Sequence, residues 1–322
     1  MNNLAIGVDF GGTKIACGLV DTKTGRLVGT TKKKTRVLDD SKDVQARLQS
    51  TIDELLAETN VDIKDTLGIG IGSAGMIDRK KGVLLLAPNL GVSQIPITEP
   101  LSKHYNVPCR LGNDVEVGTL GELEYGAGRQ CDSFVCIFVG TGIGSGIVCD
   151  GKQYLGATGT AGEIGHTIVV PDGRKCGCGG SGCLETYASR TAVAKEILAG
   201  LEKGFDSGIS DKIDLSKGII RSKALAHGVE SADELVIHAI TKAAQYMGIG
   251  LASLINFYNP QRIILGGGLI EAVELYLEVA IKETRLRTLS VPGRHLDIVK
   301  AELGDFAGII GAAMLMKNHK QT

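Results

Sequence analysis

Short apolar runs separated by glycine-rich or polar turns open the chain. Runs at 4–9 and 15–20 flank the turn Gly11-Gly12-Thr13, and a third run occupies 27–33. Behind an expected cap at Ser41, apolar residues recur at helical spacing as far as residue 56. The pattern predicts three strands and then a helix, with a tight turn between the first two strands.

Two further apolar runs, 67–71 and 107–111, lead into a glycine turn and into Asn113-Asp114. Such runs are typical of buried strands in an α/β sheet, whose ends carry site residues. A helix is predicted at 115–123. The pattern then starts again, with a run at 133–139, glycine-rich residues 140–144 and a run at 145–149. The repeat of strand, glycine turn and strand suggests two related halves.

Longer helical patterns occupy the second half of the chain. They cover 186–201 and 232–256, and a strand at 262–265 then leads into Gly266-Gly267-Gly268 and another helix. Residues 201–222 are rich in Lys, Asp, Gly and Ser and predict a loop-rich excursion. A last apolar helix at 306–316 is expected to pack back on the first domain. We therefore predict two domains: a small N-terminal α/β domain of residues 1–112 with 306–322, and a large C-terminal α/β domain of residues 113–305.

Composition narrows the class of protein. At 322 residues the chain is long enough for two domains. Its 35 Lys and Arg residues nearly balance 36 Asp and Glu residues, so no net positive charge attracts nucleic acid or an anionic membrane. The one basic cluster, Lys32 to Lys34 with Arg36, lacks interleaved aromatic residues, and neither a membrane span nor a signal peptide is recognisable. We expect a cytoplasmic protein that binds neither nucleic acid nor membranes.

Glycine is unusually frequent, and its positions suggest chemistry. The 45 glycines are roughly twice the average share, and three glycine turns follow predicted strands. At the first turn the backbone can approach an oxyanion, while Thr13 and Lys14 add a hydroxyl and a cation. Neither the P-loop spacing nor a dinucleotide fingerprint in its proper context is present. A single glycine turn is more often a simple turn than a phosphate-binding loop. Three of them at strand ends favour a nucleotide-binding protein.

His166 precedes three closely spaced cysteines, Cys176, Cys178 and Cys183. Three thiolates and one imidazole form a closed tetrahedral ligand set for a structural Zn²⁺. Reduced cysteines on a loop are the alternative, whereas a redox pair is disfavoured because the Cys-x-x-Cys spacing is absent. The other five cysteines are scattered through apolar segments, where we expect small buried side chains.

Polar residues at the ends of predicted segments are candidates for substrate chemistry. Asp114 follows a buried strand, where it can be either a general base toward an alcohol or a helix cap. Asn113, Glu163, His166 and Glu185 add amide, carboxylate and imidazole groups. Such a mixture of donors and acceptors suits a neutral ligand with many hydroxyl groups.

Together these motifs resemble the ROK family of sugar kinases and transcriptional repressors. The segments that carry the resemblance are Asp9 to Lys14, Gly140 to Gly146, Ala161 to His166 and Cys176 to Glu185. The match extends in consistent order from Val8 to Gly311. It implies the actin-like ATPase (ribonuclease H-like) fold, in which two α/β domains hold a nucleotide in the cleft between them.

The resemblance also implies a role for each matched residue. Asp114 would be the base that accepts the proton of the sugar hydroxyl. The residues that would hold the sugar are Gly75, Asn89, Asn113, Asp114, Glu163, His166 and Glu185. The residues that would hold the nucleotide are Asp9, Gly11, Gly12, Thr13, Lys14, Thr141, Gly142, Gly267 and Gly268. The zinc ligands would be His166, Cys176, Cys178 and Cys183.

From this resemblance we expect an ATP- and Mg²⁺-dependent hexokinase that phosphorylates the 6-hydroxyl of glucose and forms a homodimer or homotetramer. N-acetylmannosamine, fructose or allose stay open as substrates, and ADP or polyphosphate as phosphoryl donors. A sugar-sensing regulator without turnover is the alternative from another class. The family's repressors carry an additional N-terminal helix-turn-helix domain, for which the strand predicted from Leu4 leaves no room, so we expect the enzyme. Departures from the family pattern at Ala74, at Glu116 and in the lack of tryptophan concern the sugar pocket rather than the reaction.

Overall fold

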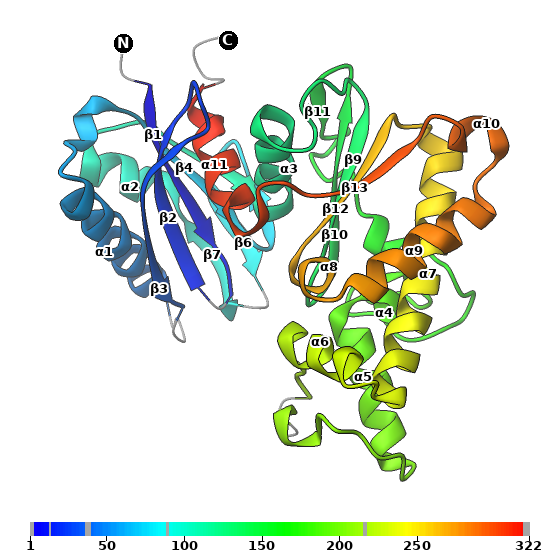
Figure 1. Ribbon diagram of the computed structural model, residues 1–322. Coiled ribbons are helices and arrows are strands. Elements are labelled where there is room, and N and C mark those ends of the chain that lie inside the picture. Colours follow the sequence, from blue (N-terminus) through cyan, green and yellow to red (C-terminus); the bar gives the residue numbers. More distant parts are fainter. Residues whose placement is uncertain (1–2, 13, 36–39, 88–89, 215–217, 318–322) are drawn as a thin grey trace. The chain divides into compact units, whose positions relative to one another are not determined.

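The computed structural model describes residues 3–12, 14–35, 40–87, 90–214 and 218–317. The chain divides into two compact units, Met1–Arg129 with Asp305–Thr322, and Gln130–Gly304. Each unit contains a five-stranded mixed sheet with helices packed on it (Figure 1). Within the described ranges, no helix combines the length and the hydrophobicity that a bilayer span requires.

The sheet of the first unit has the strand order β3-β2-β1-β4-β8. Its strands are β1 (Leu4–Phe10), β2 (Lys14–Asp21), β3 (Leu27–Lys34), β4 (Thr66–Ser73) and β8 (Cys109–Asn113). Strand β1 pairs antiparallel with β2 and parallel with β4, which in turn pairs parallel with β8. The register aligns Phe10, Ser73 and Asn113, so the carboxyl ends of the three parallel strands form one edge.

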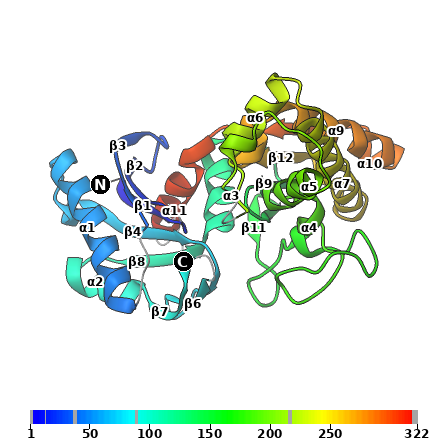
Figure 2. The ribbon, with the colours of Figure 1, turned by 90° about the horizontal axis from the view of Figure 1, so that it is seen from below.

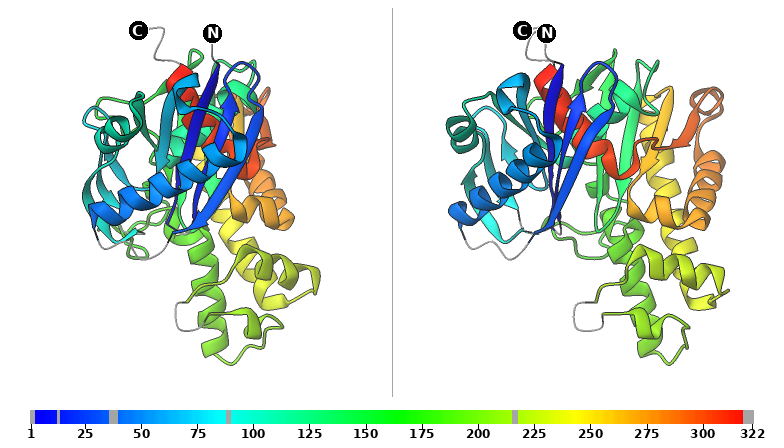
Figure 3. Two further views of the ribbon diagram at one scale, coloured as in Figure 1. Left: turned by 90° about the vertical axis from the view of Figure 1, so that its left-hand side faces the viewer. Right: turned by 60° about the vertical axis from the view of Figure 1, so that its left-hand side comes forward.

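The two faces of this sheet carry different side chains because residues alternate along a strand. Ile6 and Val8 belong to a core with helix α1, whereas Ala5 packs with helix α11. On the face of α11, a Cβ atom on Gly7 would lie 1.9 Å from the Ile309 carbonyl oxygen, so only glycine permits this close approach. Figures 2 and 3 show α1 and α11 on opposite faces. The helices of the unit are α1 (Ser41–Thr59), η1 (Ile63–Asp65), α2 (Thr98–Tyr105), α3 (Asp114–Tyr125), η5 (Gly304–Phe306) and α11 (Ala307–Lys317).

A small antiparallel sheet follows β4 in the same unit. Its strands are β5 (Met76–Asp78), β6 (Val83–Ala87) and β7 (Val92–Pro96). The sequence does not predict this sheet, because strands of three to five residues are too short to establish a period. Strand β5 contacts β8, whose last residue is Asn113.

The sheet of the second unit has the order β11-β10-β9-β12-β13. Its strands are β9 (Phe134–Val139), β10 (Ile143–Cys149), β11 (Lys152–Tyr154), β12 (Arg262–Gly266) and β13 (Asp297–Lys300). Strand β9 pairs antiparallel with β10 and parallel with β12, as β1 does with β2 and β4. The repeated pattern in the sequence therefore corresponds to two sheets of the same topology.

Seven α-helices and two short 3₁₀ segments of the described chain complete the second unit. They are η3 (Ile164–His166), α4 (Glu185–Ala188), α5 (Arg190–Glu202), η4 (Ser210–Lys212), α6 (Ser222–Glu230), α7 (Glu234–Tyr258), α8 (Gly268–Ala272), α9 (Glu274–Arg287) and α10 (Ser290–Gly293). The inward side chains Val135 and Ile137 of β9 share one core with Ile197 of α5 and Met247 of α7. The parallel strands of the unit are thereby covered with apolar side chains.

Two helix boundaries differ from the sequence-based expectation. The N-cap of α1 is Asp40 rather than Ser41, because the Asp40 carboxylate accepts the N–H groups of Lys42 and Asp43. The helix expected at 186–201 is two helices, α4 and α5. Ser189 separates them, since its backbone is extended and its hydroxyl caps α5.

The domain boundary also lies elsewhere. Residues 113–129 fall in the first unit, whereas the sequence analysis placed them in the C-terminal domain. The reason is packing: helix α3 lies against α11, and a Cβ on Gly311 would come within 1.6 Å of the Val117 carbonyl oxygen. Helix α3 therefore packs beside α11, on the same face of the first unit's sheet.

Candidate active site

The first glycine turn joins β1 to β2. The Gly11 N–H donates to the Lys14 carbonyl at 3.1 Å and closes the turn that contains Gly12. The ammonium group of Lys14 lies 3.4 Å from the carboxylate of Asp305, and both side chains are exposed. Thr13 lies outside the described residues. A cation thus stands beside a glycine backbone at the end of β1, an arrangement that suits a phosphate group.

Asp9 lies one residue before the end of β1. Burial and, to a smaller extent, the negative charge of Asp114 together raise the pKa of Asp9 to about 6, while Lys14 acts in the opposite direction. The two carboxylates, Asp9 and Asp114, therefore interact electrostatically within the first unit. Without a ligand, part of this carboxylate is protonated near neutral pH. A ligand that brings a cation or a hydrogen-bond donor to Asp9 would favour its charged form.

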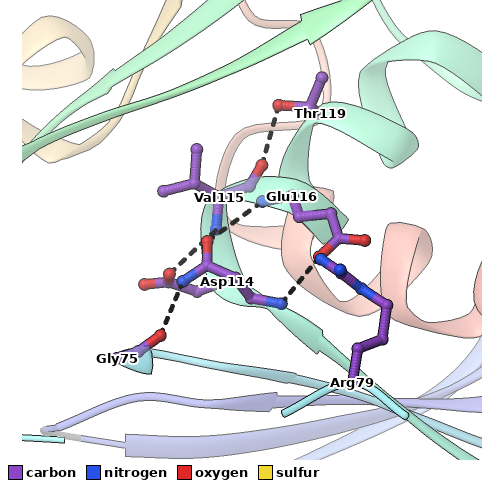
Figure 4. A network of polar contacts seen from close by, with 7 residues as sticks. Gly75, Arg79, Asp114, Val115, Glu116 and Thr119 are labelled. Atoms are coloured by element: carbon purple, nitrogen blue, oxygen red, sulfur yellow. Dashed lines mark hydrogen bonds and ion pairs between the residues drawn. The ribbon is translucent and has the colours of Figure 1, made fainter. Parts of the chain in front are cut away.

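Helix α3 begins where β8 ends, and Asn113 caps it. The Asn113 side-chain oxygen accepts the N–H groups of Val115 at 2.9 Å and Glu116 at 3.4 Å, while its amide nitrogen donates to the Gly75 carbonyl at 3.2 Å (Figure 4). Asp114 is the first residue of the helix and not its cap. The capping role that the sequence allowed for Asp114 therefore belongs to Asn113.

The Asp114 carboxylate is buried and accepts few hydrogen bonds. Its Oδ1 accepts the N–H of Val115 at 3.0 Å. Burial raises the pKa of Asp114, and the hydrogen bonds from the Val115 backbone and the Asn113 side chain only partly offset this effect. A raised pKa makes the carboxylate a stronger base than an exposed aspartate.

The second glycine turn joins β9 to β10 in the second unit. The Gly140 N–H donates to the Gly142 carbonyl at 2.9 Å. Glu185, the first residue of α4, accepts the N–H of Ile143 at 2.8 Å through Oε2. The same oxygen would lie only 2.4 Å from a Cβ atom on Gly142. The carboxylate of Glu185 therefore packs directly on this turn.

Helix α5 holds the second turn from another side. Arg190, its first residue, donates from Nη2 to the Thr141 hydroxyl at 2.8 Å, and the Thr191 hydroxyl donates to the Thr141 carbonyl at 2.6 Å. The Arg190 backbone N–H donates to the Gly140 carbonyl at 2.9 Å. Partial burial lowers the pKa of Arg190, although a guanidinium stays charged at neutral pH. The turn thus carries a fixed cation.

The third glycine turn follows β12. Gly267 has φ 91°, and a Cβ atom there would lie 2.7 Å from the backbone nitrogen of Val139. Any other residue would be strained and would clash with β9. Gly268 begins α8.

The four predicted zinc ligands lie together. One ligand atom from each of His166, Cys176, Cys178 and Cys183 lies within 4.8 Å of all the others. The Sγ atoms of Cys178 and Cys183 are 3.7 Å apart, and the Cys176 Sγ atom lies 3.7 Å from His166 Nδ1. A tetrahedron with Zn–S bonds of about 2.3 Å has sulfur–sulfur edges of about 3.8 Å, so the set fits Zn²⁺.

His166 connects this cluster to a carboxylate. Its Nδ1 atom faces the thiols, and its Nε2 atom lies 4.0 Å from the carboxylate of Glu163. The Glu163 side chain is 64% exposed, so it is open to a ligand from solvent. A metal on Nδ1 would orient the ring and leave Nε2 for a hydrogen bond.

The predicted residues therefore form several sets. In the first unit they are Asp9, Gly11, Gly12, Lys14, Gly75, Asn113 and Asp114; in the second they are Thr141, Gly142, Glu163, His166, Cys176, Cys178, Cys183, Glu185, Gly267 and Gly268. Asn89, like Thr13, lies outside the described residues.

Two like sheets with glycine turns after their first strands define the class of the protein: it has the two-domain actin-like ATPase fold. The chain belongs to the ROK family, whose model matches residues 5–319. A glucokinase of Halalkalibacterium halodurans is 31% identical over 319 residues, which cover 98% of this chain and 96% of that protein.

A solved structure and a regulator complete the comparison. The crystal structure of a ROK family glucokinase from Streptomyces griseus in complex with glucose and AMPPNP is 32% identical, with a TM-score of 0.82 over 98% of this chain and 99% of that chain. A xylose repressor of Caldicellulosiruptor bescii is 29% identical over 97% of this chain and 77% of its own length.

The structure also shows polar contacts that were not predicted from the sequence. Arg190 gave no signal, because its contact with Thr141 joins residues 49 positions apart. Glu116 did give one: Asn113 and Glu116 have the spacing of a capping box, and the structure contains that box.

Proposed function

We propose that the chain is a glucokinase-type hexose kinase that transfers the γ-phosphoryl group of MgATP to the 6-hydroxyl of glucose. The observation that carries the proposal is at the start of α3. There Asn113 caps the helix, so that the Asp114 carboxylate, whose pKa is raised, is available as a base. The similarity to a glucokinase solved with glucose and AMPPNP supports the choice of sugar and donor.

In this mechanism Asp114 accepts the proton of the attacking hydroxyl. Phosphoryl transfer needs little covalent help from the protein, so the remaining residues align the reactants and neutralise charge. In the first unit, Asn113 and Gly75 bind sugar hydroxyls. In the second unit, Glu163, His166 and Glu185 do the same, each with an acceptor or donor that a neutral sugar can use.

The three glycine turns bind MgATP. Gly11, Gly12 and Lys14 contact phosphates at the first turn, Thr141 and Gly142 at the second, and Gly267 with Gly268 lie at the adenosine. Arg190 joins this group, because its guanidinium is held at the Thr141 hydroxyl and can neutralise phosphate charge.

The cysteine cluster has a structural role in this proposal. His166, Cys176, Cys178 and Cys183 would hold Zn²⁺, whose four bonds would fix the loop and the ring of His166. With four protein ligands no position would be left for water, so these residues would not use the metal to activate a nucleophile. His166, oriented by the metal on Nδ1, would present Nε2 to the sugar.

A regulator without turnover is the second candidate, because a repressor is similar over nearly the whole chain. A homodimer or homotetramer and a cytoplasmic location stay predictions, as does the absence of nucleic-acid binding.

The test is a coupled assay of ADP release with MgATP and a panel of glucose, mannose, N-acetylglucosamine, N-acetylmannosamine, fructose and allose. Preference for glucose supports the proposal, and preference for another sugar keeps the reaction but replaces the substrate. Sugar binding without turnover, with ATP, ADP or polyphosphate as donor, would favour the regulator.

A further inference from the structure

An arginine at the tip of a hairpin reaches the start of α3. Arg79 follows β5 directly, and its Nη2 atom donates to Glu116 Oε2 at 2.5 Å (Figure 4). The Glu116 side chain is only 10% exposed, and the Arg79 Nε atom is buried without a hydrogen-bond partner among the described residues. Removal of Arg79 would take away the cation that faces this buried carboxylate and weaken its hold on the hairpin.

The same carboxylate oxygen belongs to the helix cap. Glu116 Oε2 also accepts the backbone N–H of Asn113 at 3.1 Å, which completes the capping box of α3. The Asn113 side chain in turn donates to the Gly75 carbonyl at 3.2 Å. Gly75 directly precedes β5 and Arg79 directly follows it. Strand β5 is therefore attached to the N-terminus of α3 at both of its ends.

We propose that Arg79, acting through Glu116, is a positioning residue for sugar phosphorylation: the ion pair fixes β5 on α3 and so aligns the Gly75 turn with Asp114. The proposal rests on the proposed function, in which Gly75 and Asp114 contact the same sugar. Without the ion pair, β5 is held to α3 by the Gly75 contact and by its packing on β8, and the turn can shift. A displacement of about 1 Å between reacting groups can lower a rate by about 10².

The test compares Arg79→Met with Lys80→Met in the full-length enzyme. Lys80 is the next residue of the same turn and is exposed, so its variant removes an equal charge from the hairpin. We expect Arg79→Met to lower kcat/KM for glucose at least about tenfold, with a raised KM for glucose and a KM for ATP within about twofold of wild type. Lys80→Met should match wild type.

The split between KM values separates positioning from mere loss of folded protein, because a smaller active fraction lowers apparent kcat and changes neither KM. Arg79→Lys restores the cation and should recover part of the lost activity. If Arg79→Met does not fold, Glu116→Gln carries the test: its amide oxygen can still accept the Asn113 N–H, but the charge of the pair is gone.

A double variant checks that the two residues act as one unit. Arg79→Met with Glu116→Gln should be no worse than the more damaging single variant, because each single change already removes the pair. The proposal would be overturned if the losses of kcat/KM in the two single variants multiplied in the double variant. It would also be overturned if Arg79→Met had the same kcat/KM for glucose as Lys80→Met. A wild-type enzyme that phosphorylates no hexose would overturn the proposed function and this proposal together, whereas an active wild type with an unaffected Arg79→Met overturns this one alone.

Discussion

Replacement of Asp9 by asparagine should stabilise the ligand-free protein at neutral pH while it impairs nucleotide binding. Burial raises the pKa of Asp9 from 3.8 to about 6, and the neighbouring Asp114 acts in the same direction. Between these two pH values the folded protein keeps a proton that the unfolded chain has released. Its stability therefore falls as the pH rises through this window, and the full loss is present above it.

The size of the effect follows from the same shift. One pKa unit corresponds to about 1.4 kcal/mol, so ionised Asp9 lowers the free energy of unfolding by about 3 kcal/mol at neutral pH. Asparagine has nearly the shape of the neutral acid and does not ionise. The stability gained by Asp9→Asn should be near zero below about pH 4 and reach about 3 kcal/mol above about pH 6.

Urea unfolding of wild type and Asp9→Asn without nucleotide, at a series of pH values, measures this difference. Asp206→Asn is the control, because Asp206 is exposed in the second unit and its charge is not among those that shift the pKa of Asp9. A gain that is equal at all pH values, or an Asp9→Asn protein that is less stable than wild type at neutral pH, would refute the reasoning.

Three further variants test other parts of the site. Cys178→Ser should release zinc, as measured by elemental analysis, and raise the KM for glucose; stoichiometric zinc with an unchanged KM would contradict the structural role. Arg190→Ala should raise the KM for ATP about tenfold and leave the KM for glucose unchanged, since one charge-assisted contact near the phosphates is lost; steady-state kinetics decide. Gly267→Ala should lower the free energy of unfolding by about 2 kcal/mol or more, because alanine at φ 91° meets the Val139 backbone, and unchanged stability in urea would refute this.

Most strands of the two large sheets could be predicted from the sequence, because they are short and largely apolar and end in a glycine or polar turn. Strands β11 and β13 could not be predicted, since they have only three and four residues and begin with a charged residue. The small sheet could not, since β5 has only three residues and no apolar period. The predicted start of a helix differs from the observed one where neighbouring polar residues compete to cap the same N–H groups. At α1 the choice between Asp40 and Ser41 depends on backbone angles that the sequence does not reveal.

Site residues within one short motif could likewise be predicted. The cluster of His166 and the three cysteines lies within residues 166–183, and the structure brings its ligand atoms together as expected. Contacts that join distant segments could not. The pair of Arg79 and Glu116 spans 37 positions and depends on how β5 packs beside β8, which no local pattern encodes.

The most direct test of the proposed catalysis is the turnover of Asp114→Asn with MgATP and glucose, paired with calorimetric binding of glucose to the same protein. Asparagine keeps the size of the side chain and removes the base. The account predicts that kcat falls by at least about 10² while glucose still binds. Near-normal turnover by Asp114→Asn would contradict the role of Asp114 as the general base and with it the proposed mechanism.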